Sequence, residues 1–314
     1  MEQVWSSVVR AGVLALMLTA CSGAHARCLV ADAPCTGTGK LEHDGRTRTF
    51  QYHLPADVEA PAPLVVALHG RLGQGKNQAQ LSGFDAVSEE EGFIVVYPDG
   101  VERSWADGRG TTPADKQGVD DVGFLTALVD HFIERFGADR RRVYAAGMSN
   151  GAMMSYRLAC ERSDRFAAIA PVAAQLGQEL AERCAPVRPV SVISFVGTED
   201  PLVPFEGGEV SGDRGPVLSV AGARGKWAEL NGCEGEPAVT QEPDRAPEDE
   251  TRVRREVHGS CREGSEIVFY VVEGGGHAWP GGKRYMREWL IGRTSDDIDA
   301  SRTAWKFFRR FQLP

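Results

Sequence analysis

The sequence has no excess of positive charge and no internal repeat. Its 35 lysines and arginines are outnumbered by 44 aspartates and glutamates, which gives a formal net charge of −9, and the arginines are scattered among acidic residues. Because a nucleic-acid partner requires a basic surface, this balance argues against nucleic-acid binding. An apolar content of 42% with 25% charged residues is ordinary for a globular protein with a sizeable core.

Long apolar stretches are also scarce, and the run near the N-terminus, residues 11–20, is too short to span a bilayer. It follows Arg10 and suits the apolar part of a signal peptide, so we expect residues 1–20 to be removed and the protein to be exported to the periplasm or beyond. Residues 18–21 (LTAC) resemble a lipobox with Cys21 as the lipidated residue, and AHA at 24–26 offers cleavage after residue 26 instead. We favour the lipobox because the apolar run abuts Cys21. Contact with a membrane is then expected only through that lipid, although an uncleaved N-terminal anchor helix is the alternative reading.

Cysteine spacings typical of zinc sites are absent, since the sequence contains no C-x-x-C and no paired Cys/His motif. Apart from Cys21, six cysteines remain after removal of the leader, an even number in a protein bound for an oxidising compartment, and this predicts three disulfides. Loops of about 25 residues closed in this way each contribute about 3 kcal/mol. Nearest-neighbour pairing is topologically simplest and joins Cys28 to Cys35, Cys160 to Cys184 and Cys233 to Cys261.

Short β-rich apolar stretches alternate with amphipathic stretches along the chain. This alternation predicts one α/β domain over residues 21–314, with a mostly parallel central sheet covered by helices on both faces. A hairpin is expected to turn at Asp44-Gly45, and the Pro-rich, charged segment 233–256 is expected to be a surface excursion, a loose hairpin tied back by Cys261. The strands are expected at 64–70, 93–100, 142–149, 167–174, 190–197 and 267–275, and helices at 122–136 and 151–163. A C-terminal helix within 295–312 should pack Trp305, Phe307, Phe308 and Phe311.

Ser149 stands in the pentapeptide GMSNG, residues 147–151, between a predicted strand and a predicted helix. A G-x-S-x-G sequence in that context is typical of a nucleophile held on a sharp turn, where the glycines leave room for strained backbone angles. A helix N-cap serine would give the same pentapeptide. The motif alone therefore leaves both interpretations open.

Asp200 and His277 follow two later predicted strands, in GTEDPLVP and GGGHAWPGG. Taken singly, they could be a turn aspartate and a structural histidine. Together the chain order Ser, Asp, His on loops after strands is the order of an α/β-hydrolase, with Ser149 as nucleophile, His277 as base and Asp200 orienting the base. The backbone N–H groups of Asn150 and Arg71 are the expected oxyanion donors. Such chemistry requires no metal or cofactor.

Other motifs carry weaker signals. Trp105 and Trp279 either line a substrate pocket or pack in the core, with nothing to separate the two readings. The pair Asp120-Asp121 is expected to cap the following helix rather than to act as an acid. Residues 70–77 match G-x-x-x-x-G-K but end in Asn77, which has no hydroxyl for Mg²⁺, so nucleotide binding is disfavoured.

The chain contains the segments YPDG and SWADGR, DDVGFLTALVDHF, DRRRVYAAGMSNGAMMSYRLAC, FAAIAPVAA, GTEDPLVPFEGG, GGGHAWPGG and DDIDASRTAWKFF. Together they resemble one family, the secreted poly(3-hydroxybutyrate) depolymerases and feruloyl esterases. The resemblance covers nearly all of the mature chain and implies an α/β-hydrolase serine esterase whose Ser, Asp and His fall on Ser149, Asp200 and His277. The chain departs from the family at Val196, where His is frequent, and at Arg71, where Cys or Gly is frequent.

The resemblance implies a hydroxyalkanoate oligo- or polyester, or a feruloyl-type plant cell-wall ester, as substrate. The last predicted helix stands directly before Pro314, so we expect no appended polymer-binding domain, which favours soluble oligomers or cell-wall esters. Two other functions stay open on the same scaffold: a catalytically silent surface-binding lipoprotein, and a peptidase or acyltransferase that uses the same three residues.

Overall fold

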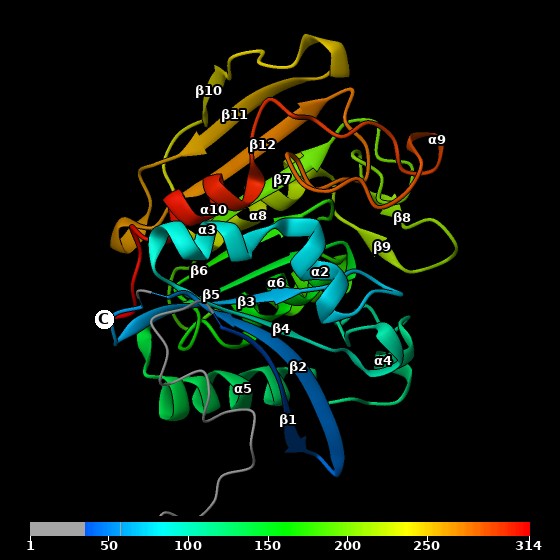
Figure 1. Cartoon of the computed structure of the whole chain (residues 1–314). Helices are drawn as coiled ribbons and strands as arrows, with labels where there is room; N and C mark the ends of the chain where they lie inside the picture. Colours follow the sequence, from blue (N-terminus) through cyan, green and yellow to red (C-terminus); the bar gives the residue numbers. More distant parts are fainter. Residues whose placement is uncertain (1–34, 57) are drawn as a thin grey trace, which may run out of the picture.

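The computed structural model describes residues 35–56 and 58–314, and a ten-stranded sheet runs through them (Figure 1). The strands in chain order are β1 (Cys35–His43), β2 (Arg46–Leu54), β3 (Ala62–Leu68), β4 (Ile94–Pro98), β5 (Ala138–Met148), β6 (Ala168–Val172), β7 (Ser191–Gly197), β10 (Ala238–Gln241), β11 (Arg252–His258) and β12 (Ile267–Glu273). A separate two-stranded sheet consists of β8 (Gly208–Glu209) and β9 (Pro216–Val217).

The α-helices are α2 (Gly75–Ser82), α3 (Phe84–Glu91), α4 (Pro113–Lys116), α5 (Asp121–Phe136), α6 (Asn150–Glu161), α7 (Gln178–Arg183), α8 (Val220–Asn231), α9 (Glu288–Ile291) and α10 (Ala300–Phe308). Short 3-10 helices are η1 (Val101–Arg103), η2 (Pro247–Asp249) and η3 (Arg262–Gly264). Within the described ranges no helix is long and apolar enough to cross a membrane.

The centre of the large sheet is parallel. The strand order is β1-β2-β4-β3-β5-β6-β7-β12-β11-β10, in which β4 through β12 pair in parallel and an antiparallel pair flanks them on either side. Every residue of β3, β4, β6 and β7 is buried, as expected for strands covered on both faces. The predicted α/β architecture is thus confirmed.

Alternate residues of each central strand enter two different cores. In β3, Leu64 and Val66 pack with the apolar faces of α5, α6 and α8, whereas Val65 packs with α2, α3 and α10. Figure 1 shows α3 and α10 lying together over one face of the sheet. This period of two explains why the strand stretches read as continuous apolar runs in the sequence.

The sequence predicted one edge of the sheet correctly and the other only in part. The hairpin at Asp44-Gly45 is confirmed, with His43 paired to Arg46. The excursion at 233–256 is not loose, because β10 and β11 form a hairpin that extends the main sheet next to β12. The charged residues of this segment obscured the strand in the sequence. Arg254 on β11 makes ion pairs with Glu256 at 2.9 Å and with Glu273 at 2.6 Å, so a charged strand face is accommodated within the sheet.

The C-terminal helix is confirmed as α10, which is capped by Asp299. Trp305 stacks on Phe93 with ring centroids 3.9 Å apart, and Phe308 stacks on Tyr144 at 4.7 Å. Phe311 lies beyond the end of the helix and packs against the same core.

Two of the three predicted disulfides are confirmed. Cys160–Cys184 joins α6 to the end of α7, and Cys233–Cys261 joins the end of α8 to the segment after β11. The third predicted pair includes Cys28, which lies outside the described residues, as do the predicted signal segment and Cys21.

Candidate active site

Ser149, Asp200 and His277 all follow the carboxyl ends of parallel strands. Ser149 comes directly after β5, Asp200 shortly after β7, and His277 shortly after β12. These strands are linked through β6 in one continuous parallel array. Because parallel strands end at the same edge of a sheet, the three residues are brought to one edge, as the sequence predicts.

The turn from β5 into α6 leaves little room around Ser149, whose backbone has φ 55° and ψ −118°. Positive φ is costly for a residue with a side chain and persists only where the surroundings enforce it. A Cβ on Gly147 would lie 2.4 Å from the carbonyl oxygen of Gly151, and one on Gly151 would lie 2.3 Å from that of Leu68. Ser149 stands at the N-cap position of α6, yet its side chain makes no capping hydrogen bond. The geometry therefore favours a serine presented to solvent over a helix cap.

Asp200 and His277 form a buried pair. The ring Nδ1 of His277 donates to Oδ2 of Asp200 at 2.7 Å, and only 4% and 3% of the two side chains are exposed. The other carboxylate oxygen accepts from the backbone N–H groups of Leu202 at 2.8 Å and Val203 at 2.9 Å. These contacts fix the orientation of the ring with Nδ1 toward Asp200. The other ring nitrogen, Nε2, takes no part in the pair. Within the described residues no hydrogen bond joins the Ser149 hydroxyl to His277.

Tyr285 contacts the backbone of His277. Its hydroxyl donates to the carbonyl oxygen of His277 at 3.0 Å. Desolvation and the nearby negative charge of Asp200 raise the pKa of the Tyr285 phenol well above its usual value, so the hydroxyl remains a donor at alkaline as well as neutral pH.

Asn150 is the first residue of α6, and its backbone N–H lies where a helix offers no internal acceptor. Its side chain is buried and fully engaged. Oδ1 accepts from the backbone N–H of Trp105 at 2.8 Å, while Nδ2 donates to the carbonyl oxygen of Trp105 at 3.1 Å and to Asp107 at 2.6 Å. The sequence suggested no role for this amide, which fastens the turn at Ser149 to the segment after η1.

Asn150→Ala should therefore cost about 1–3 kcal/mol of unfolding free energy, because it leaves buried partners at Trp105 and Asp107 without their hydrogen bonds. The catalytic rate should fall as well, since the first turn of α6 loses its anchor. Denaturant unfolding and ester hydrolysis measure the two effects. Asn77→Ala, at an exposed asparagine of α2, is the matched control and should stay within about 0.5 kcal/mol of the native protein. Equal stability of both variants would contradict the anchoring role.

The loop that carries Arg71 is positioned by His69. Nε2 of His69 accepts from the backbone N–H of Gly100 at 2.9 Å, and Nδ1 donates to the carbonyl oxygen of Gly70 at 2.8 Å. Burial lowers the pKa of His69, which keeps the ring neutral and able to accept. The backbone N–H of Leu72 also donates to the carbonyl oxygen of Arg103 at 2.8 Å. The loop is therefore held on both sides of Arg71, whose role as an oxyanion donor stays a prediction.

Trp105 and Trp279 are almost completely buried, so both are core-packing residues and not pocket walls. The indole N–H of Trp105 donates to the carbonyl oxygen of His69 at 2.9 Å, which places the ring under the Arg71 loop. Trp279 donates to Ser301 at 3.1 Å and packs edge-on against Phe84.

The two aspartates at the start of α5 differ in environment. Asp120 caps the helix by accepting from Gly123 N–H at 2.8 Å, as expected. Asp121 instead forms a buried ion pair with Arg48 at 2.6 Å and accepts from Ala106 N–H at 2.7 Å. In the described part of the chain, no group of three His, Cys, Asp or Glu side chains could hold a metal ion.

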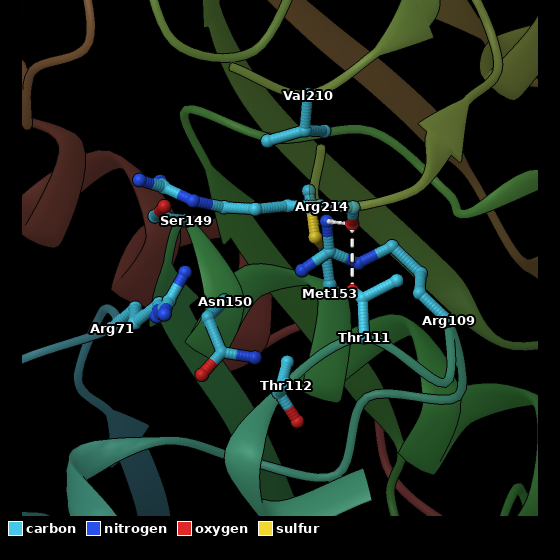
Figure 2. Close-up of a pocket in the computed structure, with 9 residues that line it drawn as sticks. All are labelled: Arg71, Arg109, Thr111, Thr112, Ser149, Asn150, Met153, Val210 and Arg214. Carbon is cyan, nitrogen blue, oxygen red and sulfur yellow. Dashed lines mark hydrogen bonds between the residues drawn. The ribbon is translucent and has the colours of Figure 1, made fainter. Parts of the chain in front are cut away.

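A small cavity opens to solvent beside Ser149 (Figure 2). Its wall combines the turn at Ser149, the Arg71 loop, the segment before α4 and the connection between β8 and β9. The lining residues are Arg71, Arg109, Thr111, Thr112, Ser149, Asn150, Met153, Val210 and Arg214. Sequence reasoning missed Arg109 and Arg214. Arg109 ends the segment SWADGR, which carries the resemblance without indicating a role for this residue, and Arg214 belongs to no motif. Their loops come from distant parts of the chain.

The fold and the site together define an α/β-hydrolase: a mostly parallel sheet between helical layers, with a strained serine at the turn after a central strand. A solved structure with this fold, the acetyl xylan esterase from Aspergillus awamori, superposes with a TM-score of 0.56 at 17% identity, over 77% of this chain and 94% of that one. The chain belongs to the family described as Esterase PHB depolymerase, whose model matches residues 49–203, and it is a carboxylic ester hydrolase.

Relatives in sequence agree with this assignment. The chain is 33% identical over 292 residues to "Putative esterase NocK" from Nocardia uniformis subsp. tsuyamanensis, covering 88% of this chain and 83% of that protein. It is 29% identical over 262 residues to feruloyl esterase B from Piromyces equi, covering 81% of this chain but 43% of that protein.

Proposed function

We propose that this protein is an exported serine esterase that cleaves carboxylic esters through an acyl-enzyme, with Ser149 as nucleophile, His277 as general base and Asp200 as the group that orients His277. The observation that carries the proposal is the strained turn at Ser149 at the same sheet edge as the buried His277–Asp200 pair. The apolar N-terminal run and the disulfides support export.

The hydrogen bonds of His277 suit the general base. Because the Nδ1–H of His277 donates its hydrogen bond to Asp200, Nε2 carries a lone pair and takes the proton of Ser149 as Oγ bonds to the ester carbonyl carbon. The backbone N–H groups of Asn150 and Arg71 stabilise the resulting oxyanion. His277 then returns the proton to the departing alkoxide, and the alcohol leaves. Water attacks the acyl-enzyme by the same route and frees the acid and Ser149.

For the substrate we propose a hydroxyalkanoate oligo- or polyester or a feruloyl-type ester, because the family description points to the first and a named relative to the second. Hydrolysis of 3-hydroxybutyrate oligomers and polymer granules should be compared with hydrolysis of methyl ferulate. Turnover of the oligomers well above that of methyl ferulate would assign the protein to the hydroxyalkanoate esters, and the reverse order would assign it to the feruloyl esters.

Activity-based labelling separates this proposal from its alternatives. A fluorophosphonate probe should modify the native protein at Ser149 and leave Ser149→Ala unlabelled, since only an activated serine reacts. A native protein that resists the probe would instead favour the catalytically silent, surface-binding lipoprotein. Amide cleavage or aminolysis faster than ester hydrolysis would favour the peptidase or acyltransferase.

A further inference from the structure

Three arginines line the cavity beside Ser149, and they are not equivalent. Arg109 is neutralised by Asp107, with Nη2 2.7 Å from the carboxylate and Nε bonded to the same group. Arg71 and Arg214 form no ion pair among the described residues. Figure 2 shows the side chain of Arg214 reaching toward Ser149 from one side of the cavity and that of Arg71 from another. The cavity thus holds two positive charges in excess next to the serine.

The position of Arg214 is built into the fold. It lies in the connection between β8 and β9, far from Ser149 in sequence. Its carbonyl oxygen accepts from Nη1 of Arg109 at 2.6 Å and from the hydroxyl of Thr111 at 2.8 Å, the two contacts dashed in Figure 2. Its own backbone N–H donates to the carbonyl oxygen of Val210 at 3.2 Å. The charge of Arg109 is therefore used to fix the backbone that presents Arg214.

The guanidinium of Arg214 has unsatisfied bonding capacity. Its Nε is buried and has no hydrogen-bond partner within the described residues. Partial burial, and then the positive charges of Arg71 and Arg109, lower its pKa, so the site disfavours the cation it contains. A buried donor without an acceptor is costly, and two like charges on one wall repel each other. An anion between them would relieve both costs.

We propose that Arg71 and Arg214 form a subsite for a carboxylate carried by the ester substrate, adjacent to the bond that Ser149 attacks. A guanidinium presents paired N–H donors that match the two oxygens of a carboxylate. The inference rests on the proposed esterase function and deepens it. It favours substrates with a free acid group near the ester, such as the acid end of a hydroxyalkanoate oligomer, over neutral esters such as methyl ferulate.

The carboxylate could lie on either side of the scissile bond, so the test uses two matched pairs of esters. Mono-4-nitrophenyl glutarate and its methyl ester place the charge, or its neutral counterpart, on the acyl side. The linear dimer of 3-hydroxybutyrate and its methyl ester place it on the alcohol side. For each pair the preference is the ratio of kcat/KM for the anionic ester to that for the neutral ester, which cancels differences in general activity. The pair in which the native enzyme shows a preference identifies the side.

Arg214→Gln should lower that preference by about 10- to 100-fold, mostly through a higher KM for the anionic ester, because one charge-assisted hydrogen-bonded contact is lost. Arg214→Lys keeps the charge without the planar donor pair, so its preference for the anionic ester should lie between those of the native enzyme and Arg214→Gln. Arg188→Gln, an arginine just before β7 at the opposite edge of the sheet, is the matched control and should leave the preference unchanged.

A second measurement needs no variant and therefore does not depend on folding. In the native enzyme, free glutarate should inhibit hydrolysis of the neutral 4-nitrophenyl ester competitively, and more strongly than sodium chloride of equal ionic strength. Absence of any anionic preference, or a preference that Arg214→Gln leaves intact, would overturn the subsite. Failure of the esterase proposal is a separate result, because Ser149→Ala would then retain turnover of all four esters.

Discussion

Ser149→Ala is expected to lower kcat on 4-nitrophenyl acetate by about 10⁶, the scale found when the serine of a Ser-His-Asp triad is removed. The alanine has no oxygen to bond to the carbonyl carbon, so the acyl-enzyme cannot form. The residual rate should reflect only the oxyanion donors and substrate binding. The turn itself should persist, because its shape is imposed by the contacts of Gly147 and Gly151. Stopped assays with purified protein, together with a thermal unfolding curve, measure both points.

Ser155→Ala is the matched control for this experiment. Ser155 lies on the same helix, α6, is fully buried, and donates to the carbonyl oxygen of Gly151 at 3.0 Å. Its removal should change stability slightly and kcat by only a few fold. If Ser149→Ala retained more than about a hundredth of the native kcat, the nucleophile would have to be another residue.

The central architecture was predictable because its sequence signal is local. A strand buried on both faces, such as β3 or β7, has to be a continuous apolar run, and that run is visible without any tertiary knowledge. The hairpin at Asp44-Gly45 likewise follows from turn chemistry. By contrast, β11 carries Arg254, whose charges are compensated by residues on its own strand and on β12. A strand stabilised by cross-strand ion pairs has no local signature that separates it from a charged loop.

The residues of the candidate site also separate into those that the sequence could predict and those that it could not. Ser149, Asp200 and His277 could be proposed from the sequence because each follows a recognisable strand, and parallel strands deliver their following loops to one edge. The side chain of Asn150, by comparison, has a role only through Trp105 and Asp107, and Arg214 reaches the site through an anchored loop. For Trp279, two residues after His277, the sequence left pocket lining and core packing equally open, and the ring lies in the core. Proximity along the chain does not decide on which side of a loop a residue lies.

Asp200→Asn is expected to lower kcat by about 10⁴ while leaving the fold intact. Oδ1 of Asp200 accepts from the backbone N–H groups of Leu202 and Val203, so an amide in this position must turn its oxygen toward them. Its NH₂ group then faces Nδ1 of His277 and can only donate. The His277 ring must therefore adopt the tautomer that has the lone pair on Nδ1 and the proton on Nε2. In that tautomer His277 has no lone pair to receive the Ser149 proton.

The expected signature is a loss in kcat with little change in KM, because the tautomer affects proton transfer and not the walls that bind substrate. Thermal unfolding should stay close to native, since the two backbone hydrogen bonds persist. Asp164→Asn, at an exposed aspartate paired with Arg162, is the control for a lost surface charge and should keep native kcat. If Asp200→Asn raised KM at native kcat, Asp200 would act in substrate binding. If instead the loss of kcat came with a large loss of stability, the carboxylate would serve mainly to hold the loop after β7, and the orientation of His277 would have to depend on its backbone contacts with Ile291 and Tyr285.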